Sequence, residues 1–417
     1  MKSNITNYKE HTATSNKLMR AIFDSFKLQN FYLFLLLGFI LLWQIKLYAG
    51  DDEKDKKCPH EFKMLYNLQA TSVKDQGKTG TCWSFATTSF IESELLRMGK
   101  GEFDLAEMYF VKNCYLPKAK KYVRYHGTTN FGEGGQAHDV LWVIENFGFV
   151  PQEVFNGKTF EQEKYDQGEM TSIFDGMMKA ITKTRGEVSP VWPSALNSLL
   201  DIYLGKNPET FLYDSVEYTP KSFVEKTGFN PDDYYEFTSY SHHPFYERIN
   251  LEIPDNWLDQ YYYNIPIDDI VKIMDYALAN GYTVAWDGDV GGDNFLKPGY
   301  AVIPEVKDDE KNKDDDEDDD EEEDIEPEIE KVVTQEMRQK AFDSYSTTDD
   351  HLMHVTGLAE NQNGTKFYYT KNSWGTKKQG FDGYWYMSEQ FVRLKTIAIL
   401  VHKDAVPKEI IGKLQAQ

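Results

Sequence analysis

Apolar positions recur with a helical period along several stretches of the chain. Cys82 to Met98 contains no Gly or Pro, and Phe85, Phe90 and Leu95 supply an apolar face before Gly99 ends the run. The same signals predict three further helices, over residues 104–115, 136–147 and 270–279. A helix that begins at residue 82 places the Cys82 side chain at a helix N-terminus.

Strand-like patterns dominate the last part of the chain. Residues 351–360 and 366–371 are short strand-like runs on either side of Asn363-Gly364, which is a strong hairpin signal. Earlier in the chain, residues 66–73 alternate loosely and lead into the glycine-punctuated loop 75–80. Helices early in the chain and strands late in it predict an α+β fold.

Two stretches interrupt this pattern. Residues 150–265 are rich in Tyr, Phe, Pro and Asp, which favours ordinary loop and core packing over the lining of a cleft. Residues 307–331 contain an acidic run from Asp314 to Asp324, which cannot bury apolar surface and repels itself. We therefore predict a disordered, solvated surface insertion there, rather than a calcium site.

Composition changes the picture in one respect. A hydrophobic content of 41% and an aromatic content of 15% indicate a folded body, and residues 307–331 supply most of the formal net charge of -23. Nucleic acid and anionic lipid surfaces repel an acidic protein, so the charge argues against both as partners.

The N-terminal part carries an apolar segment from Phe31 to Trp43 that is too short for a membrane span. Its length suits a secretory signal, and Ala49 is a small residue where a signal peptidase could cut. We predict that residues 1–50 form an export signal, with Met19 as an alternative start, or an uncleaved anchor through residues 31–49. Both interpretations place the rest of the chain in the periplasm or outside the cell.

The chain has three cysteines, too few for a disulfide framework. If Cys82 is a nucleophile, Cys58 and Cys114 either form one disulfide or remain two free thiols, and we favour free thiols.

Cys82 has the surroundings that a nucleophilic thiol requires. A thiol attacks a peptide carbonyl only as the thiolate, so the site must lower its pKa, and a helix N-terminus does so. The Cys82 backbone N–H and the side-chain amide of Gln76 can together bind the oxyanion of the tetrahedral intermediate. Gly80 lets a substrate backbone approach, and Trp83 can pack under the loop.

His351 and Asn372 are the expected base and orienting residue. If the hairpin loop is residues 360–363, antiparallel pairing places the two directly opposite each other. The alternative two-residue loop Asn363-Gly364 pairs Asn372 with Val355, on the same face. His354 points to the opposite face and is rejected.

No metal or cofactor site is predicted. The chain lacks a His-Glu-x-x-His motif, and His242-His243 has no evident partners. Asp287-Gly288-Asp289 fails as a calcium loop because Pro298 occupies the twelfth position. A transglutaminase-like site would have an Asp as the orienting residue, where this chain has Asn372.

Residues 76–86 and Asn372-Ser373-Trp374-Gly375 resemble the papain superfamily. Thr79 departs from the papain pattern, and His351 lies much farther from Cys82 than in papain. The long separation is similar to that of the bleomycin hydrolase and aminopeptidase C branch. That resemblance covers most of residues 65–407 and extends through four further segments, at residues 134–136, 148–151, 289–291 and 403–407.

The resemblance implies a papain-like two-lobed fold within a peptidase domain at residues 51–417. It implies a helical lobe at about 65–150, a family-type insertion at about 150–265 and a β lobe at about 335–405. The functional residues would be Cys82, His351, Asn372 and Gln76, with Trp374 shielding the Asn–His hydrogen bond.

The implied activity is that of a cysteine peptidase acting on peptide substrates through an acyl-enzyme, most simply an aminopeptidase. A cysteine endopeptidase with an open cleft and an inactive exported binding protein are the alternatives. In the relatives a C-terminal arm limits cleavage to N-terminal residues, and only Lys408 to Gln417 follow Pro407 here. The resemblance also implies a homo-oligomer, a hexamer.

Overall fold

The computed structural model describes residues 58–296, 298–305, 326–377 and 380–415. The predicted export signal or anchor lies outside these residues, as does the acidic segment up to residue 325. Among the described residues, none of the helices has the length and apolar character needed to cross a membrane.

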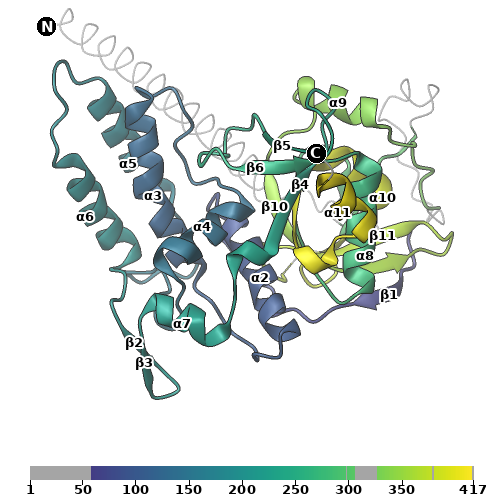
Figure 1. The fold of residues 1–417 in the computed structure, drawn as a ribbon, viewed down its shortest axis with the longest axis horizontal. Coiled ribbons are helices and arrows are strands. Elements are labelled where there is room, and N and C mark those ends of the chain that lie inside the picture. Colours follow the sequence, from purple (N-terminus) through teal and green to yellow (C-terminus); the bar gives the residue numbers. More distant parts are fainter. Residues whose placement is uncertain (1–57, 297, 306–325, 378–379, 416–417) are drawn as a thin grey trace, which may run out of the picture. The chain divides into compact units, whose positions relative to one another are not determined.

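Helices dominate the first half of the described chain (Figure 1). They are α2 (Cys82–Arg97), α3 (Glu107–Arg124), α4 (Ala137–Phe147), α5 (Gly168–Thr182), α6 (Trp192–Leu204) and α7 (Pro220–Thr227). Their apolar sides meet in one core that includes Phe90, Phe110, Phe149 and Phe174. Helix α3 runs well beyond its predicted end and contains Pro117.

An 11-stranded sheet forms the second part, in the order β5-β6-β4-β13-β7-β10-β11-β12-β9-β8, with β1 also paired to β10. Its strands are β1 (Lys63–Asn67), β4 (Tyr234–Thr238), β5 (Glu247–Asn250), β6 (Tyr261–Asn264), β7 (Val284–Gly288), β8 (Phe295–Leu296), β9 (Tyr300–Ala301), β10 (His351–Glu360), β11 (Lys366–Lys371), β12 (Tyr384–Ser388) and β13 (Thr396–His402). A separate hairpin joins β2 (Phe211–Tyr213) to β3 (Val216–Tyr218).

Four helices accompany the sheet: α8 (Ile267–Ala279), α9 (Gln335–Asp343), α10 (Glu389–Lys395) and α11 (Lys408–Gln415). Short 3-10 turns occupy Pro231–Asp233 and Lys403–Ala405. The sheet and these helices share a second core, which includes Trp286, Met353 and Phe391. The helices of the first half gather around one core, and the sheet and the later helices gather around another, so the α+β prediction is confirmed.

Helix α2 connects the two parts of the fold. Leu352 of β10, Ala285 of β7 and Leu400 of β13 belong to the helical core, so α2 packs directly on the middle of the sheet. The first residue of α2 is Cys82, and the first residue of β10 is His351.

The middle of the chain is more regular than its sequence indicated. Within residues 150–265 the structure places α5, α6, α7 and the strands β2 to β6, and β4, β5 and β6 extend the main sheet. Tyr262 is fully buried in β6, as expected for core packing.

The end of the segment predicted as a disordered insertion is ordered. Glu330 pairs with Pro304, and its carboxylate accepts hydrogen bonds from Ile303 N (2.8 Å) and Ser388 Oγ (2.5 Å). Glu328 lies 3.2 Å from His60 Nε2. The prediction of disorder is therefore wrong for residues 326–331, because these side chains find partners on the sheet.

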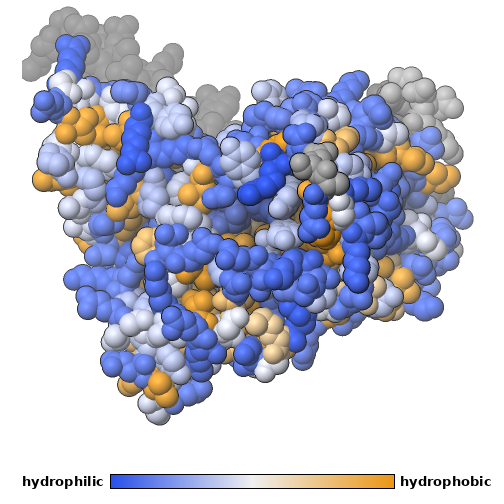
Figure 2. Space-filling model, in the orientation of Figure 1, coloured by the Kyte–Doolittle hydropathy of each residue, from blue (hydrophilic) through white to orange (hydrophobic). Residues whose placement is uncertain are grey.

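Side chains on the face shown in Figure 2 are mostly hydrophilic, with hydrophobic ones scattered among them. All three cysteines are free, as favoured from the sequence: Cys82 and Cys114 are buried, and Cys58 is half-buried.

Candidate active site

Cys82 begins helix α2 and is 8% exposed. The first backbone N–H groups of the helix that bond back along the chain are those of Ser84 and Phe85, both to Thr81 O. The N–H groups of Cys82 and Trp83 therefore remain free for other acceptors, as at any helix start. The backbone N–H groups of Leu352 and Trp83 face the Cys82 thiol.

Burial raises the pKa of the Cys82 thiol to about 12, and the carboxyl groups of Asp287 and Asp349 add to the increase. The two backbone N–H groups lower it by less. The predicted lowering of the thiol pKa is therefore wrong for this arrangement, because the helix N-terminus is outweighed by the loss of water and by nearby acidic groups.

His351 and Asn372 contact each other directly. His351 Nε2 lies 2.8 Å from Asn372 Oδ1, and the same oxygen accepts a bond from Ser373 N (2.7 Å). The Ser373 N–H can only donate, which identifies this atom as the amide oxygen, so His351 donates to it from Nε2 and leaves Nδ1 as an acceptor. Burial lowers the pKa of His351, and the Asn372 bond opposes this.

The strand pairing observed in the hairpin is neither of the two registers predicted from the sequence. Glu360 pairs with Lys366, and after an irregularity His354 pairs with Lys371. Asn372 follows β11 directly, so it lies beyond the last strand pair rather than opposite His351 or Val355. The contact forms across a diagonal, which a long side chain can span.

Trp374 packs over the histidine. The rings of His351 and Trp374 have centroids 4.7 Å apart at an angle of 32°. His354 instead lies on the α2 side of the strand, where its Nδ1 is 2.8 Å from Ser89 Oγ. This placement agrees with its rejection as a base.

Gln76 is joined to the same segment as Asn372. Its backbone N donates to Ser373 O (2.8 Å), and its side-chain Oε1 accepts from Ser373 Oγ (2.5 Å). Gln76 Nε2 donates one hydrogen to Thr79 O (2.7 Å), which leaves its second hydrogen available to another acceptor. Ser373 therefore connects two of the predicted site residues.

Glu133 was not identified from the sequence, although it holds the loop before Cys82. Its side chain accepts from Gly80 N, and its backbone oxygen accepts from Trp83 Nε1 (2.8 Å). Trp83 is fully buried against Gly135, where a Cβ would lie 2.9 Å from the ring. Trp83 packs under the loop as predicted, whereas Gly80 faces the Glu133 side chain.

Three acidic residues, Asp255, Asp287 and Asp349, also lie in this region, and we call them the acidic group. Asp287 pairs with Leu352 across β7 and β10, and Asp349 accepts a bond from Gln136 Nε2 (2.8 Å). Burial and the charge of Asp255 raise the pKa of Asp349 to about 8, and burial together with Asp349 raises the pKa of Asp287.

No sequence pattern predicted that the three residues of the acidic group lie close together. Its members come from three distant segments, and Asp287 had been considered only as part of a calcium loop. Among the described residues, one cluster could hold a metal ion, His242, His243 and Glu252, and it does not include Cys82 or His351.

Comparisons with known proteins agree with this geometry. The family model "Peptidase C1-like family" matches residues 198–417, and "Papain family cysteine protease" matches residues 58–181. Bleomycin hydrolase from Mus musculus is 22% identical, with 86% of each chain covered. Aminopeptidase C from Listeria monocytogenes is also 22% identical, with 87% of each chain covered.

Among solved structures, pepw from Lactobacillus rhamnosis HN001 matches with a TM-score of 0.66 at 20% identity, covering 85% of both chains. Together with the papain-family match, this likeness confirms the papain-like fold.

Proposed function

The chain belongs to the Peptidase C1-like family and is a cysteine-type peptidase of the branch that includes bleomycin hydrolase and aminopeptidase C; from this we propose that it is an aminopeptidase with Cys82 as nucleophile. The observation that carries the assignment of residues is the bond between His351 Nε2 and Asn372 Oδ1, with the Cys82 thiol against the neighbouring Leu352 backbone.

In the proposed first step, the proton of Cys82 Sγ moves to His351 Nδ1, and a thiolate–imidazolium pair forms. No proton is exchanged with water, and the opposite charges stabilise each other, which offsets part of the cost of burial. Asn372 holds the imidazole in the tautomer that can accept this proton. Trp374 keeps water from the bond between Asn372 and His351.

The thiolate then attacks the carbonyl carbon of the peptide. The negative charge moves to the carbonyl oxygen, where Gln76 Nε2 and the Cys82 backbone N–H can donate to it. Collapse of the intermediate breaks the C–N bond, and His351 gives its proton to the leaving amine. A water molecule then loses a proton to His351 Nδ1, attacks the thioester and releases the acid, which restores the thiol.

Two observations support an aminopeptidase over an endopeptidase. Several relatives are named aminopeptidases, and Asp287 and Asp349 of the acidic group are close enough to Cys82 to raise its pKa. A substrate with a free N-terminus brings an ammonium group next to the reacting carbonyl. That charge would be attracted by the acidic group and would draw the proton off Asp349.

The test compares the full-length protein on an aminoacyl fluorogenic amide and on its N-acetylated counterpart. We expect cleavage of the free-amine substrate alone, abolished by a thiol alkylator and by Cys82→Ala, because the variant lacks the nucleophile. Cleavage of both substrates would identify an endopeptidase instead. Turnover that survives Cys82→Ala would exclude Cys82, and no turnover of either substrate would favour an inactive binding protein.

A further inference from the structure

Two adjacent histidines and a glutamate converge on one point of the surface, away from Cys82. His242 and His243 lie in the turn after β4, and Glu252 follows β5. His242 Nε2 is 3.2 Å from Glu252 Oε2, and His243 Nε2 is 3.0 Å from both carboxylate oxygens. The donor atoms of all three side chains lie within 4.8 Å of one another.

These separations fit a tetrahedral metal site. A zinc ion binds imidazole nitrogen and carboxylate oxygen at about 2.0–2.1 Å, which places neighbouring ligand atoms about 3.3 Å apart. Both histidines approach through the same nitrogen, Nε2, and their ring centroids are 4.3 Å apart with the planes tilted by 49°. The rings therefore converge on Glu252 instead of stacking on each other.

The turn that carries the histidines is held rigidly by the fold. Asn264, a fully buried residue of β6, donates from Nδ2 to the backbone oxygens of Tyr240 (2.9 Å), His243 (3.1 Å) and Pro244 (3.0 Å). A turn fixed in this way lets consecutive side chains point to one side, which an extended strand does not allow. The histidine positions are thus set before any ion arrives.

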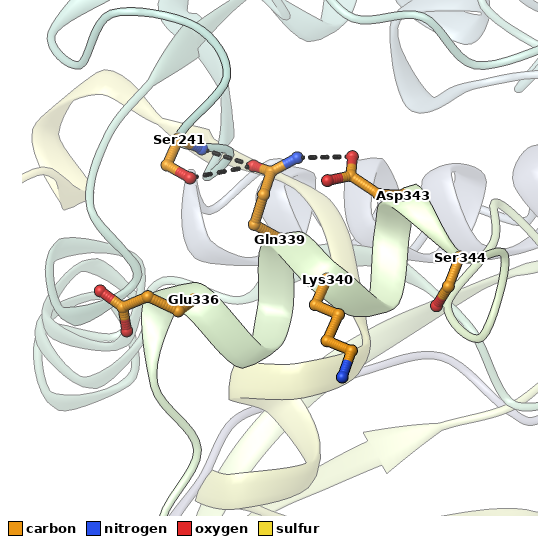
Figure 3. Close-up of a pocket in the computed structure, with 6 residues that line it drawn as sticks. All are labelled: Ser241, Glu336, Gln339, Lys340, Asp343 and Ser344. Atoms are coloured by element: carbon orange, nitrogen blue, oxygen red, sulfur yellow. Dashed lines mark hydrogen bonds between the residues drawn. The ribbon is translucent and has the colours of Figure 1, made fainter.

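The His242 ring has a further partner in α9. Its Nδ1 is 3.2 Å from Gln339 Oε1, and it also lies 3.0 Å from Gln339 Nε2. Figure 3 shows how that amide is oriented: Gln339 Oε1 accepts from Ser241 N (2.7 Å), and Gln339 Nε2 donates to Asp343 (2.9 Å). Donation from Nδ1 to Oε1 leaves the Nε2 lone pair for a metal, and histidines that bind metal ions commonly donate their other ring N–H to a neighbouring oxygen in this way.

The charge and accessibility of the cluster also suit a cation. Glu252 supplies a carboxylate on an exposed side chain, and the His242 and His243 side chains are partly exposed, so an ion can reach all three from solvent. Ser241 and Gln339 line a surface hollow of about 390 Å³, so solvent reaches this side of α9.

We propose that His242, His243 and Glu252 bind a zinc ion, with water in the fourth position. Two nitrogen donors and one carboxylate favour Zn²⁺ over Ca²⁺ or Mg²⁺, which prefer oxygen ligands. The ion would join the turn after β4 to the end of β5. This site does not depend on the proposed peptidase residues.

The test measures zinc binding by titration calorimetry on the full-length Cys82→Ala protein, treated with EDTA and then freed of it. The Cys82 substitution removes a thiol that could itself bind zinc. We expect one equivalent of Zn²⁺ to bind, and the affinity to fall at least tenfold in both Glu252→Gln and His243→Asn. Cys58, Cys114 and the acidic run are present in every protein compared, so their contribution cancels.

Two further readouts keep the result interpretable. Bound Co²⁺ should give the visible bands of a tetrahedral ion in the parent and not in Glu252→Gln, and Zn²⁺ should raise the unfolding temperature of the parent but not that of Glu252→Gln. His126→Asn, which removes an exposed histidine elsewhere, should bind zinc like the parent. The proposal would be overturned if Glu252→Gln bound zinc as tightly as the parent, or if His126→Asn lost as much zinc affinity as Glu252→Gln. The cluster would then be an ordinary His–Glu ion pair.

Discussion

Asn372 determines which nitrogen of His351 carries the hydrogen. Its Oδ1 receives both His351 Nε2 and Ser373 N, so the amide cannot rotate without losing two hydrogen bonds. Asn372→Ala should therefore leave the nucleophile in place but lower kcat by about 10²-fold, since orientation and not bond formation is lost. Steady-state kinetics on the aminoacyl amide measures kcat and KM separately.

A structural role for Asn372 would give a different result. If Asn372→Ala mainly loosened the fold, its unfolding temperature would fall and kcat would recover when the assay is cooled. Asn363→Ala is the matched control and should keep full activity, because Asn363 lies in the exposed hairpin loop at the opposite end of β11 from Asn372. An unchanged kcat in Asn372→Ala would contradict the proposed orienting role.

Local sequence was sufficient to identify some site residues and not others. Cys82, Gln76 and Asn372 lie in short, distinctive runs, and the structure brings Gln76 and Asn372 together through Ser373. Glu133 and Asp287 reach the site from segments that only the fold brings near, so no local pattern could indicate them.

At the scale of elements, the sequence predicted the two strands of the hairpin but not the register in which they pair. The two strands were predicted with the right bounds, residues 351–360 and 366–371, because alternation and Asn363-Gly364 are local signals. The register was wrong because the loop is residues 361–365, which pairs Glu360 with Lys366, and because the pairing shifts again between Val355 and Gly357. Such a shift arises from packing against neighbouring strands.

The loop before α2 depends on a glycine. Gly77 has φ +65°, and a Cβ there would lie 2.3 Å from Tyr165 O. Gly77→Ala should destabilise the protein by about 1–2 kcal/mol for the left-handed backbone and roughly 1–3 kcal/mol more for the displaced neighbour. It should also lower kcat/KM, because Gln76 moves with the loop. Urea unfolding and steady-state kinetics test both expectations.

Gly364 provides the control for this substitution. Its φ is +77°, but a Cβ there meets nothing within 4 Å. Gly364→Ala should therefore carry the backbone cost alone, with no change in kcat/KM. Equal destabilisation by the two substitutions would show that the contact with Tyr165 does not constrain the loop.

For the whole molecule, the middle segment is the part of the chain whose helices and strands the sequence did not predict. Residues 150–265 contribute helices to one core and the strands β4, β5 and β6 to the sheet, yet their sequence has no clear period. Strands that are covered on both faces need not alternate, so burial conceals the local signal. Glu236 and Phe237 of β4, for example, are both buried.

The acidic group makes the stability of the whole molecule depend on pH. Burial raises the pKa of Asp349 to about 8, and the ordinary value in an unfolded chain is about 3.9. Between these values the folded protein holds a proton that the unfolded chain has released, so the free energy of unfolding falls as pH rises from about 4 to about 8. Asp287, whose pKa burial also raises, acts in the same direction.

Asp349→Asn should weaken this dependence, because the amide does not titrate and can still bond to Gln136. Urea unfolding between pH 5 and pH 8.5 should give a shallower decline for the variant than for the parent, and a more stable protein at pH 8.5. Burial raises the pKa of Glu107 to about 7, and this residue remains in both proteins, so the decline should not vanish. Asp293→Asn, at an exposed position, is the control, and its free energy of unfolding should change with pH as that of the parent does. If the free energy of unfolding of Asp349→Asn falls with pH as steeply as that of the parent, Asp349 holds no extra proton in the folded state.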